Sequence, residues 1–247
     1  MSTIHKAFRV IEIIGELGCA SIQEISSKSG FPPSTVHRIL TTLLEIGYAV
    51  QEPSNKSYSL SLRFFELGSK IQDKFNLIPY ARPYLLILNE KTKESINLAV
   101  LDGDAAVYLD HVNSEYGLQL FTKIGARVSL YSTGVGKIFL SRFGYDEFNE
   151  YIEKHPIVAK TSKTIVDKHK LEAELEQIRK RGYAIDNEEN EYGSRCVATL
   201  IYYYNDKTAA ALSVSGPAVR ITPDRYDEIG RMAMNFAGSI AEALGYR

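Results

Sequence analysis

A cluster of polar side chains marks the start of one predicted helix, within the segment GFPPSTVHRILTTLLEIGYAV that runs from Gly30 to Val50. The cluster comprises Ser34, Thr35, His37, Arg38 and Thr41. Arginine can bind guanine or phosphate through two hydrogen bonds, and serine and threonine can bind either. The start of a helix also has backbone N–H groups without helical partners, and these attract anions such as phosphate. The residue types therefore favour contact with DNA, helix N-terminus first.

Three short helices would position this cluster. Apolar residues recur every three or four positions in the quoted segment and predict a helix that buries Val36, Ile39, Leu40, Leu43 and Leu44. Ser21 and Glu24 have the spacing of a capping box at the start of a second helix, which ends near Gly30. A first helix is predicted to bury Ala7, Val10, Ile11, Ile14 and Leu17. Short helices joined by a tight turn are typical of a helix-turn-helix.

A β-hairpin is predicted after the third helix. The period changes to two in the runs that begin at Tyr48 and Tyr58, on either side of the turn EPSNKS, which places Lys56 at the tip. Helices plus hairpin form a winged helix-turn-helix. Residues 1–66 contain six Lys/Arg and six Asp/Glu, and strong DNA binders are usually more basic. On pattern alone, a protein-interaction module therefore stays open as the alternative.

The remaining chain predicts an α+β domain. A linker helix continues from Phe64 to Phe75, and an apolar helix runs on to about Lys93. Two hairpins follow, INLAVL with AVYLDHV and VATLIYYY with AAALSVS, and LQLFTKI is predicted as a further strand. Helices are predicted around 145–155, 166–181 and 223–244. Strand pairs separated by helices are typical of a sensor-like α+β domain.

Enzyme signatures in this second region are incomplete. STGVGK resembles the end of a phosphate-binding loop, but Tyr131 and Ile138 occupy positions where that motif needs glycine and Ser or Thr. The five histidines lack H-E-x-x-H spacing, and SVSGP lacks the first glycine of a nucleophile elbow. Cys196 could act as a nucleophile, although no neighbouring residue identifies a base. A Cys196-dependent hydrolase or transferase with an appended interaction module is therefore the alternative function.

Small and polar residues at predicted element ends indicate a ligand site instead. Thr133–Gly136 precedes a helical run at Lys137–Arg142, where glycine allows backbone N–H groups to approach a carboxylate closely. Ser213 and Ser215 alternate on one strand face, and Asp186 opens the acidic loop DNEENE. A plain turn and a solvated acidic loop explain the same residues equally well.

Composition sets the broad class. The chain has 247 residues, 45% hydrophobic and 24% charged, with a formal net charge of −1, which argues neither for nor against a nucleic-acid partner. Its two cysteines form no disulfide framework and no zinc motif, so a reducing cytoplasm is expected. The apolar runs fall short of the roughly 18 residues of a membrane span. Glu12 and Glu16 interrupt the N-terminal apolar pattern, which excludes a signal peptide.

The segment SIQEISSKSGFPPSTVHRILTTLLEIGYAVQEPSNKSYSLSLRFFELG closely resembles the DNA-binding half of the IclR family of bacterial transcriptional regulators. The specific parts are P-x-S-T-V-H-R-I-L followed by L-x-x-x-G-Y, and the wing ending Y-S-L-S-L-x-x-x-E-L-G. The resemblance implies DNA contacts from Ser34, Thr35, His37, Arg38 and Thr41, with Lys56 on the wing. Pro33 stands where the family often has lysine or another polar residue, so one usual backbone contact is not expected here.

Three further segments, GARVSLYSTGVGKIFL, RGYAIDNEENEYGSRCVA and AALSVSGPAVRITPDR, resemble the effector-binding domain of that family, which has a GAF-like fold. The resemblance implies a pocket made by Leu120, Val128, Gly134, Val135, Asp186, Cys196, Ser213 and Ser215. Backbone N–H groups and the two serine hydroxyls would hold a small carboxylate, and Asp186 and Cys196 would contact a hydroxyl or carbonyl. Two positions depart from the family. Tyr131 stands where members commonly have histidine, and Ser194 stands where some members have an apolar residue, so the size and polarity of the pocket are expected to differ.

The resemblance covers nearly the whole chain. It predicts a winged helix-turn-helix at residues 1–66, a linker helix at 67–76 and a GAF-like effector-binding domain at 77–247. It implies a cytoplasmic repressor, released or tuned by a small organic acid, that binds near-palindromic double-stranded operator DNA as a dimer or tetramer. Catalytic residues, metals, cofactors and membrane contact are not expected.

Overall fold

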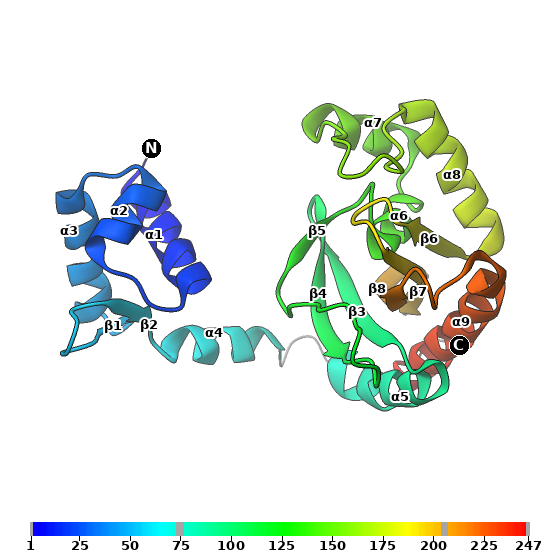
Figure 1. Ribbon diagram of the computed structural model, residues 1–247, viewed down its shortest axis with the longest axis horizontal. Coiled ribbons are helices and arrows are strands. Elements are labelled where there is room, and N and C mark those ends of the chain that lie inside the picture. Colours follow the sequence, from blue (N-terminus) through cyan, green and yellow to red (C-terminus); the bar gives the residue numbers. More distant parts are fainter. Residues whose placement is uncertain (1, 73–76, 204–206, 246–247) are drawn as a thin grey trace. The chain divides into compact units, whose positions relative to one another are not determined.

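Two compact units make up the chain, Met1–Asn76 and Leu77–Arg247. The computed structural model describes residues 2–72, 77–203 and 207–245 (Figure 1). Within these ranges, no helix has both the length and the apolar character that crossing a membrane requires.

The first unit packs three helices against a short hairpin and ends in a fourth helix. Its elements are α1 (Thr3–Leu17), α2 (Ile22–Ser29), α3 (Pro33–Glu45), β1 (Ala49–Gln51), β2 (Tyr58–Leu60) and α4 (Arg63–Gln72). β1 and β2 are antiparallel, with Val50 opposite Ser59. The predicted winged helix-turn-helix is confirmed.

The turn between α2 and α3 follows from local chemistry. The backbone N–H of Ser21 donates to Oε2 of Glu24 at 2.8 Å, and the N–H of Glu24 donates back to Ser21 Oγ at 3.3 Å. This capping box satisfies two amides at the start of α2. Gly30 ends the helix with φ at 71°, a left-handed conformation that glycine adopts without a steric penalty.

The core of the first unit lies between α1, α2 and α3. Val10, Ile14, Val36 and Leu40 are fully buried, as predicted. The predicted stripe on α1 was wrong at its end, because Leu17 is 38% exposed while Ile13 is fully buried. Positions 10, 13 and 14 share one helical face, whereas position 17 is the last residue of the helix.

The second unit is an antiparallel sheet with helices on both faces. Its elements are α5 (Leu77–Thr92), β3 (Ser95–Asp102), β4 (Ala105–Val112), β5 (Arg127–Ser129), α6 (Gly134–Leu140), α7 (Tyr145–Lys154), α8 (Lys168–Arg181), β6 (Tyr183–Asn187), β7 (Ser194–Tyr203), β8 (Lys207–Pro217), η2 (Pro223–Arg225) and α9 (Tyr226–Ala243). The strand order is β5-β4-β3-β8-β7-β6. The unit is α+β, as predicted.

Two hydrophobic cores flank this sheet. On one face, Leu85 of α5 and Ile240 of α9 pack with Leu98 and Val214. On the other face, Val135 and Phe139 of α6 pack with Ala198, and α7 and α8 lie beyond α6 (Figure 1). Because side chains alternate along a strand, every second residue of β3, β7 and β8 faces α6. The site described below lies on that face.

Some predicted elements were placed wrongly. The segment Leu118–Ile124 forms no strand: the Leu118 and Leu120 carbonyls accept hydrogen bonds from Arg220 and Ser95 side chains, in place of a strand ladder. The short helix begins at Gly134, three residues before its predicted start, because the Thr133 hydroxyl caps it there. β6 was not predicted. The predicted turn Asn205–Lys207 begins outside the described residues.

Candidate functional site

The predicted DNA-contact residues lie on the outer side of α3 and at the hairpin tip. Ser34, His37, Arg38 and Lys56 are exposed, and Thr35 and Thr41 are half-buried. The opposite side of α3 carries the buried residues Val36, Ile39 and Leu40. The helix thus presents its polar side chains to solvent while its apolar stripe anchors it in the core.

The start of α3 offers fewer free amides than the sequence suggested. Pro33 has no N–H, and the amides of Thr35 and Val36 already donate to the Pro32 carbonyl at 2.9 and 3.2 Å. Of the amides expected to bind an anion in this first turn, that of Ser34 is therefore the one that remains. The side chains of α3 must supply most of any contact with a phosphate or a base edge.

The hairpin tip has a defined conformation. The N–H of Glu52 donates to the Ser57 carbonyl at 2.9 Å, and Asn55 Oδ1 accepts the Ser57 N–H at 3.0 Å. Lys56 has φ at 59°, and its carbonyl accepts a hydrogen bond from Gln51 Nε2 at 3.1 Å. The Lys56 side chain is exposed on a tip whose backbone is held on both sides.

The second unit places four of the predicted effector residues on neighbouring strands. Asp186 on β6 is opposite Cys196 on β7, and Cys196 is opposite Ser215 on β8. Directly opposed residues of an antiparallel sheet point to the same face. Ser213 lies two residues from Ser215 and therefore faces the same side. All four side chains are buried.

We call the four side chains of Asp186, Cys196, Ser213 and Ser215 the polar row. The start of α6 lies directly over it. A Cβ atom at Gly134 would come within 2.9 Å of Cys196 Sγ, so only glycine fits without a shift. Thr133 Oγ1 accepts the Gly136 N–H at 3.0 Å and donates to the Ser129 carbonyl at 2.8 Å. Gly134 and Val135, both predicted site residues, are therefore held against the polar row of the sheet.

The predicted apolar walls are half-buried. Val128 on β5 is opposite Ala106 of β4 and packs on the α6-side core. Leu120 lies in the irregular segment after β4, and its carbonyl accepts a hydrogen bond from Ser95 Oγ at 3.3 Å. Ser95 is opposite Ser215, so this hydrogen bond joins the Leu120 segment to the polar row.

Three ionisable side chains are buried at this site: Asp186 of the row itself, Lys137 of α6 and Glu189. Lys137 of α6 is fully buried and forms an ion pair with Glu189, whose other oxygen, Oε2, is buried without a hydrogen-bond partner among the described residues. Burial raises the pKa of Asp186 to about 7. Two other contacts lower that pKa: the hydrogen bond that Asp186 Oδ1 accepts from the Glu189 N–H at 2.8 Å, and the charge of Lys137. Two carboxyl groups therefore share one lysine.

Cys196 is a thiol at neutral pH. Burial raises its pKa to about 11, and the neighbouring hydroxyls of Ser215 and Ser213 only partly oppose this rise. The thiolate is the nucleophilic form of cysteine. The surroundings of Cys196 therefore suit polar contact better than covalent chemistry. Among the described residues, no group of three or more His, Cys, Asp or Glu side chains could hold a metal ion.

Sequence reasoning missed several polar residues at this site. Asn97, fully buried on β3, donates to Ser213 Oγ and Ser215 Oγ at 3.1 Å each, and His111 on β4 contacts Asn97. Lys160 places Nζ 2.7 Å from Asn190 Oδ1 and lies over the Tyr131 ring at 5.8 Å. Alternation with apolar neighbours in INLAVL could have marked Asn97 as inward-facing. The loop residue Lys160 carried no such signal.

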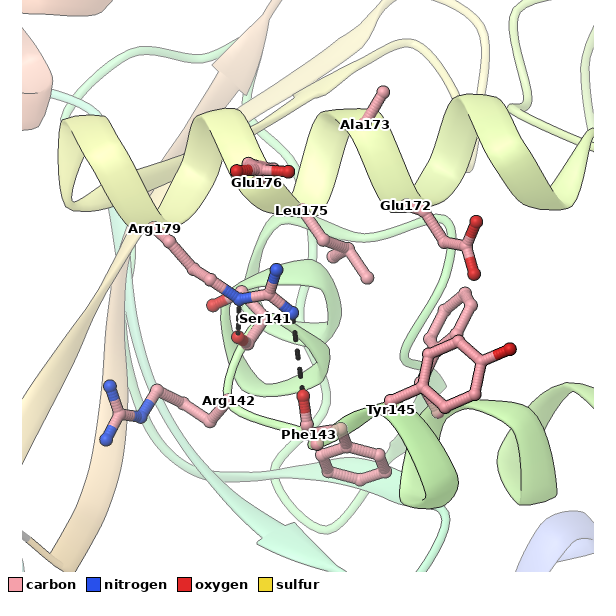
Figure 2. A pocket seen from close by; sticks show the side chains of 11 residues that line it. Ser141, Arg142, Phe143, Tyr145, Glu172, Ala173, Leu175, Glu176 and Arg179 are labelled. Atoms are coloured by element: carbon pink, nitrogen blue, oxygen red, sulfur yellow. Dashed lines mark hydrogen bonds between the residues drawn. The ribbon is translucent and has the colours of Figure 1, made fainter.

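A separate open cavity lies at the other end of α6. It measures about 830 Å³ and lies between the residues that follow α6, the start of α7 and one side of α8 (Figure 2). Arg179 of α8 donates to the Ser141 carbonyl at 2.7 Å across it. None of the predicted effector residues lines this cavity. Arg142 and Tyr145 in its lining are exposed, whereas the side chains of the polar row are buried.

The chain matches two family models, one in each half of the sequence. Residues 3–53 match the IclR helix-turn-helix domain, and residues 69–242 match the bacterial transcriptional regulator IclR C-terminal domain. The HTH-type transcriptional regulator KdgR of Escherichia coli (strain K12) is 35% identical over 246 residues, which are 100% of this chain and 94% of that protein.

Solved structures share the fold over the full length. The crystal structure of Thermotoga maritima IclR is 34% identical, with a TM-score of 0.80 and 99% of each chain covered. An IclR homologue from Microbacterium hydrocarbonoxydans, crystallised with 4-hydroxybenzoate, has a TM-score of 0.86, 100% coverage of both chains and 19% identity. This second likeness shows the fold.

Proposed function

This chain belongs to the IclR family of bacterial transcriptional regulators, and from that membership we propose that it is a cytoplasmic repressor whose operator binding is tuned by a small organic acid. Residues 1–66 bind DNA, residues 67–76 link the halves, and residues 77–247 bind the effector. The active species is a dimer or tetramer, because a twofold protein reads a near-palindromic operator.

The DNA contacts come from Ser34, Thr35, His37, Arg38 and Thr41 on α3, with Lys56 on the wing. The exposure of this face supports the assignment, since α3 buries its apolar stripe and leaves Ser34, His37 and Arg38 exposed. Arg38 makes the base contact, because a guanidinium can bind guanine bidentately. Lys56 binds the phosphate backbone beside the helix.

The effector site is formed by Gly134, Val135, Asp186, Cys196, Ser213 and Ser215, with Leu120 and Val128 as walls. The single observation that carries this proposal is the buried row of Asp186, Cys196 and Ser215 on three neighbouring strands, directly under the start of α6. A small acid, of which the 4-hydroxybenzoate bound by the Microbacterium homologue is one example, supplies a carboxylate that the serine hydroxyls can bind.

The effector acts by binding one arrangement of the two units better than another. A ligand shifts such an equilibrium only by its difference in affinity for the two states. The proposed site contributes no catalysis, and Cys196 serves as a polar wall. In agreement with this role, the raised pKa of Cys196 keeps it a thiol. A Cys196→Ala variant therefore changes the effector response of DNA binding, whereas loss of a turnover activity would favour the hydrolase alternative.

A mobility-shift experiment on the DNA that flanks the protein's own gene tests the DNA-binding half of the proposal. Folded protein at low salt is expected to retard a near-palindromic fragment, because counterion release favours binding there. The absence of any retarded band under these conditions would contradict the proposal.

Thermal unfolding against acetate, gluconate and aromatic acids tests the effector half. A ligand at a hundred times its dissociation constant adds about 2.7 kcal/mol of stability, which raises the midpoint by several degrees. The rise is expected to vanish in Ser213→Ala and to persist in Ser239→Ala, a control whose half-buried serine lies on α9 and donates to the Asn235 carbonyl at 3.2 Å. A rise that survives Ser213→Ala would place the ligand elsewhere.

A further inference from the structure

A buried hydrogen-bond network lies behind the two serines of the effector site. Asn97 Nδ2 is 3.1 Å from both Ser213 Oγ and Ser215 Oγ. Asn97 Oδ1 is 2.7 Å from His111 Nδ1, and the other ring nitrogen of His111, Nε2, is 2.9 Å from Asn113 Oδ1. Strand register sets these contacts, because Asn97 on β3 is opposite both Ser213 on β8 and His111 on β4.

The direction of these hydrogen bonds decides what the serines can offer a ligand. An amide nitrogen has two protons to donate, and a hydroxyl has one proton and two lone pairs. Where Asn97 Nδ2 donates to both serines, each serine has a lone pair occupied and its own proton free. In the absence of a ligand, a neighbouring acceptor on this face of the sheet is the sulfur of Cys196, which is directly opposite Ser215. Sulfur is a weak acceptor, so a carboxylate can take over the serine protons at little cost.

One proton on His111 fixes that direction. Burial lowers the pKa of His111, so the ring is neutral at neutral pH and has a single N–H. With the proton on Nδ1, His111 donates to Asn97 Oδ1, and the amide nitrogen faces the serines as in the structure. With the proton on Nε2, Nδ1 would accept from Asn97, the amide would be reversed, and its oxygen would take the serine protons. Asn97 is fully buried, whereas Asn113 is exposed and free to turn its amide.

We propose that Asn97, oriented by an Nδ1–H on His111, is a specificity-determining positioning residue that presets Ser213 and Ser215 as hydrogen-bond donors. The inference rests on the proposed effector site and adds the reason for its selectivity. Two preset donors suit a group that only accepts, such as a carboxylate. A carboxamide of the same shape places its own donor against one of them and leaves a polar group unpaired.

The preference for an acid over its carboxamide measures directly whether Ser213 and Ser215 are oriented as hydrogen-bond donors. We would measure dissociation constants of acetate, gluconate and 4-hydroxybenzoate, each against its carboxamide, for the full chain and for Asn97→Asp. The wild type is expected to prefer the acid by about 10- to 100-fold, the equivalent of one lost hydrogen bond to a charged group. Asn97→Asp replaces a donor by an acceptor of the same shape and is expected to reduce that ratio at least tenfold. General damage to the fold would weaken both ligands and leave the ratio unchanged.

Variants of His111 supply a second arm that does not depend on Asn97→Asp folding. His111→Asn keeps a donor close to the position of Nδ1 and is expected to retain the preference, whereas His111→Leu is expected to lose it. Asn113→Ala, which removes the exposed partner of Nε2, is the control that retains it. A ratio unchanged in both Asn97→Asp and His111→Leu would overturn the preset and leave the effector site itself standing.

The proton on His111 can also be located without any ligand. Nitrogen NMR of the full chain labelled with ¹⁵N-histidine distinguishes the two tautomers. We expect the signal assigned by its loss in His111→Asn to show a protonated Nδ1 and a bare Nε2. A protonated Nε2 would overturn the inference even where the acids bind. If no acid on the panel binds the wild type, the effector proposal fails on that panel. The tautomer of His111 then still decides whether Asn97 orients the two serines as hydrogen-bond donors.

Discussion

The polar residues of the two units are placed in opposite ways. On α3, Arg38 and His37 are exposed and stand on a helix whose other side is buried. In the effector unit, Ser213 and Asn97 are fully buried and Asp186 is 4% exposed. The first arrangement keeps its groups hydrated until a partner arrives, and the second removes its groups from water in advance.

This difference follows from the size of the partner. DNA approaches one face of a protein, so contact groups need only project outward, and water leaves when the duplex binds. A small acid must be enclosed to be recognised, so its contacts must be desolvated beforehand. Buried polar groups are costly unless they are hydrogen-bonded. The effector unit therefore needs supporting residues such as Asn97 and Lys137, and α3 does not.

The largest expected effect concerns the buried ion pair. Replacing Lys137 by Met leaves Glu189 buried and unpaired, which is expected to lower the free energy of unfolding of the second unit by about 3–5 kcal/mol. Lys154→Met is the matched control, because its partner is Glu150 and both side chains are more than 60% exposed; such pairs contribute about 0–1 kcal/mol. Urea denaturation measures both. An equal loss of unfolding free energy in the two variants would show that the buried ion pair contributes no more than the exposed one.

The next effect depends on pH. The folded pKa of Asp186, about 7, is raised above its ordinary value of 3.8. The protonated form is therefore favoured by folding, and this contribution is complete below about pH 4 and lost as pH rises through about 7. Asp186→Asn is expected to gain roughly 4 kcal/mol over wild type at pH 8, since each unit of pKa shift corresponds to about 1.4 kcal/mol, and almost nothing at pH 4.

Calorimetry across this pH range measures the gain from Asp186→Asn. Asp224→Asn, at an exposed carboxylate of η2, is the control for the removal of one surface charge. A gain in Asp186→Asn that is the same at pH 4 and pH 8 would show that folding does not raise the pKa of Asp186.

A change on α3 should affect binding and spare stability. Arg38→Ala is expected to weaken operator affinity by about 1–3 kcal/mol if the arginine contacts a base, with less than about 0.5 kcal/mol lost in folding because the side chain is exposed. Arg9→Ala, on α1 and paired with Glu12 at 3.3 Å, is the control for charge. Fluorescence anisotropy at fixed salt measures affinity. An equal loss in both variants would indicate a general charge effect.

The smallest effect is a test of local structure in the first unit. Ser21→Ala removes the capping box of α2 and is expected to cost about 1 kcal/mol. Ser27→Ala, at an exposed position inside the same helix, is expected to gain a few tenths of a kcal/mol because alanine is the better helix former. Hydrogen exchange of the α2 amides separates the two, and equal protection in both variants would show that the cap is dispensable.

Local signals in the sequence were sufficient for much of the fold. The spacing of Ser21 and Glu24 predicted a cap that the structure confirms, and Gly182 ends α8 with φ at 82° as its position after a helical pattern indicated. Alternation located both long hairpins. These features depend on residues within a few positions of one another, which is the range over which a sequence pattern carries information.

Features that depend on distant residues were not predictable. Asn97 and Ser213 are 116 positions apart and meet only through the register of β3 and β8. Lys137 falls within an apolar run and gave no sign that it is fully buried opposite Glu189. The Leu118–Ile124 segment has the composition of a strand, but side chains from elsewhere bind its carbonyls. In each case a tertiary contact decides the outcome.

The shortness of α6 brings two sites of the second unit close together. Its seven residues span about 10 Å, and all seven are buried, so the core packs around the helix along its whole length. Its first residue touches Cys196 of the effector site, and the residue after its last, Ser141, is bound through its carbonyl by Arg179. The effector site and the rim of the open cavity beside α8 therefore lie at the two ends of one short helix, about 10 Å apart.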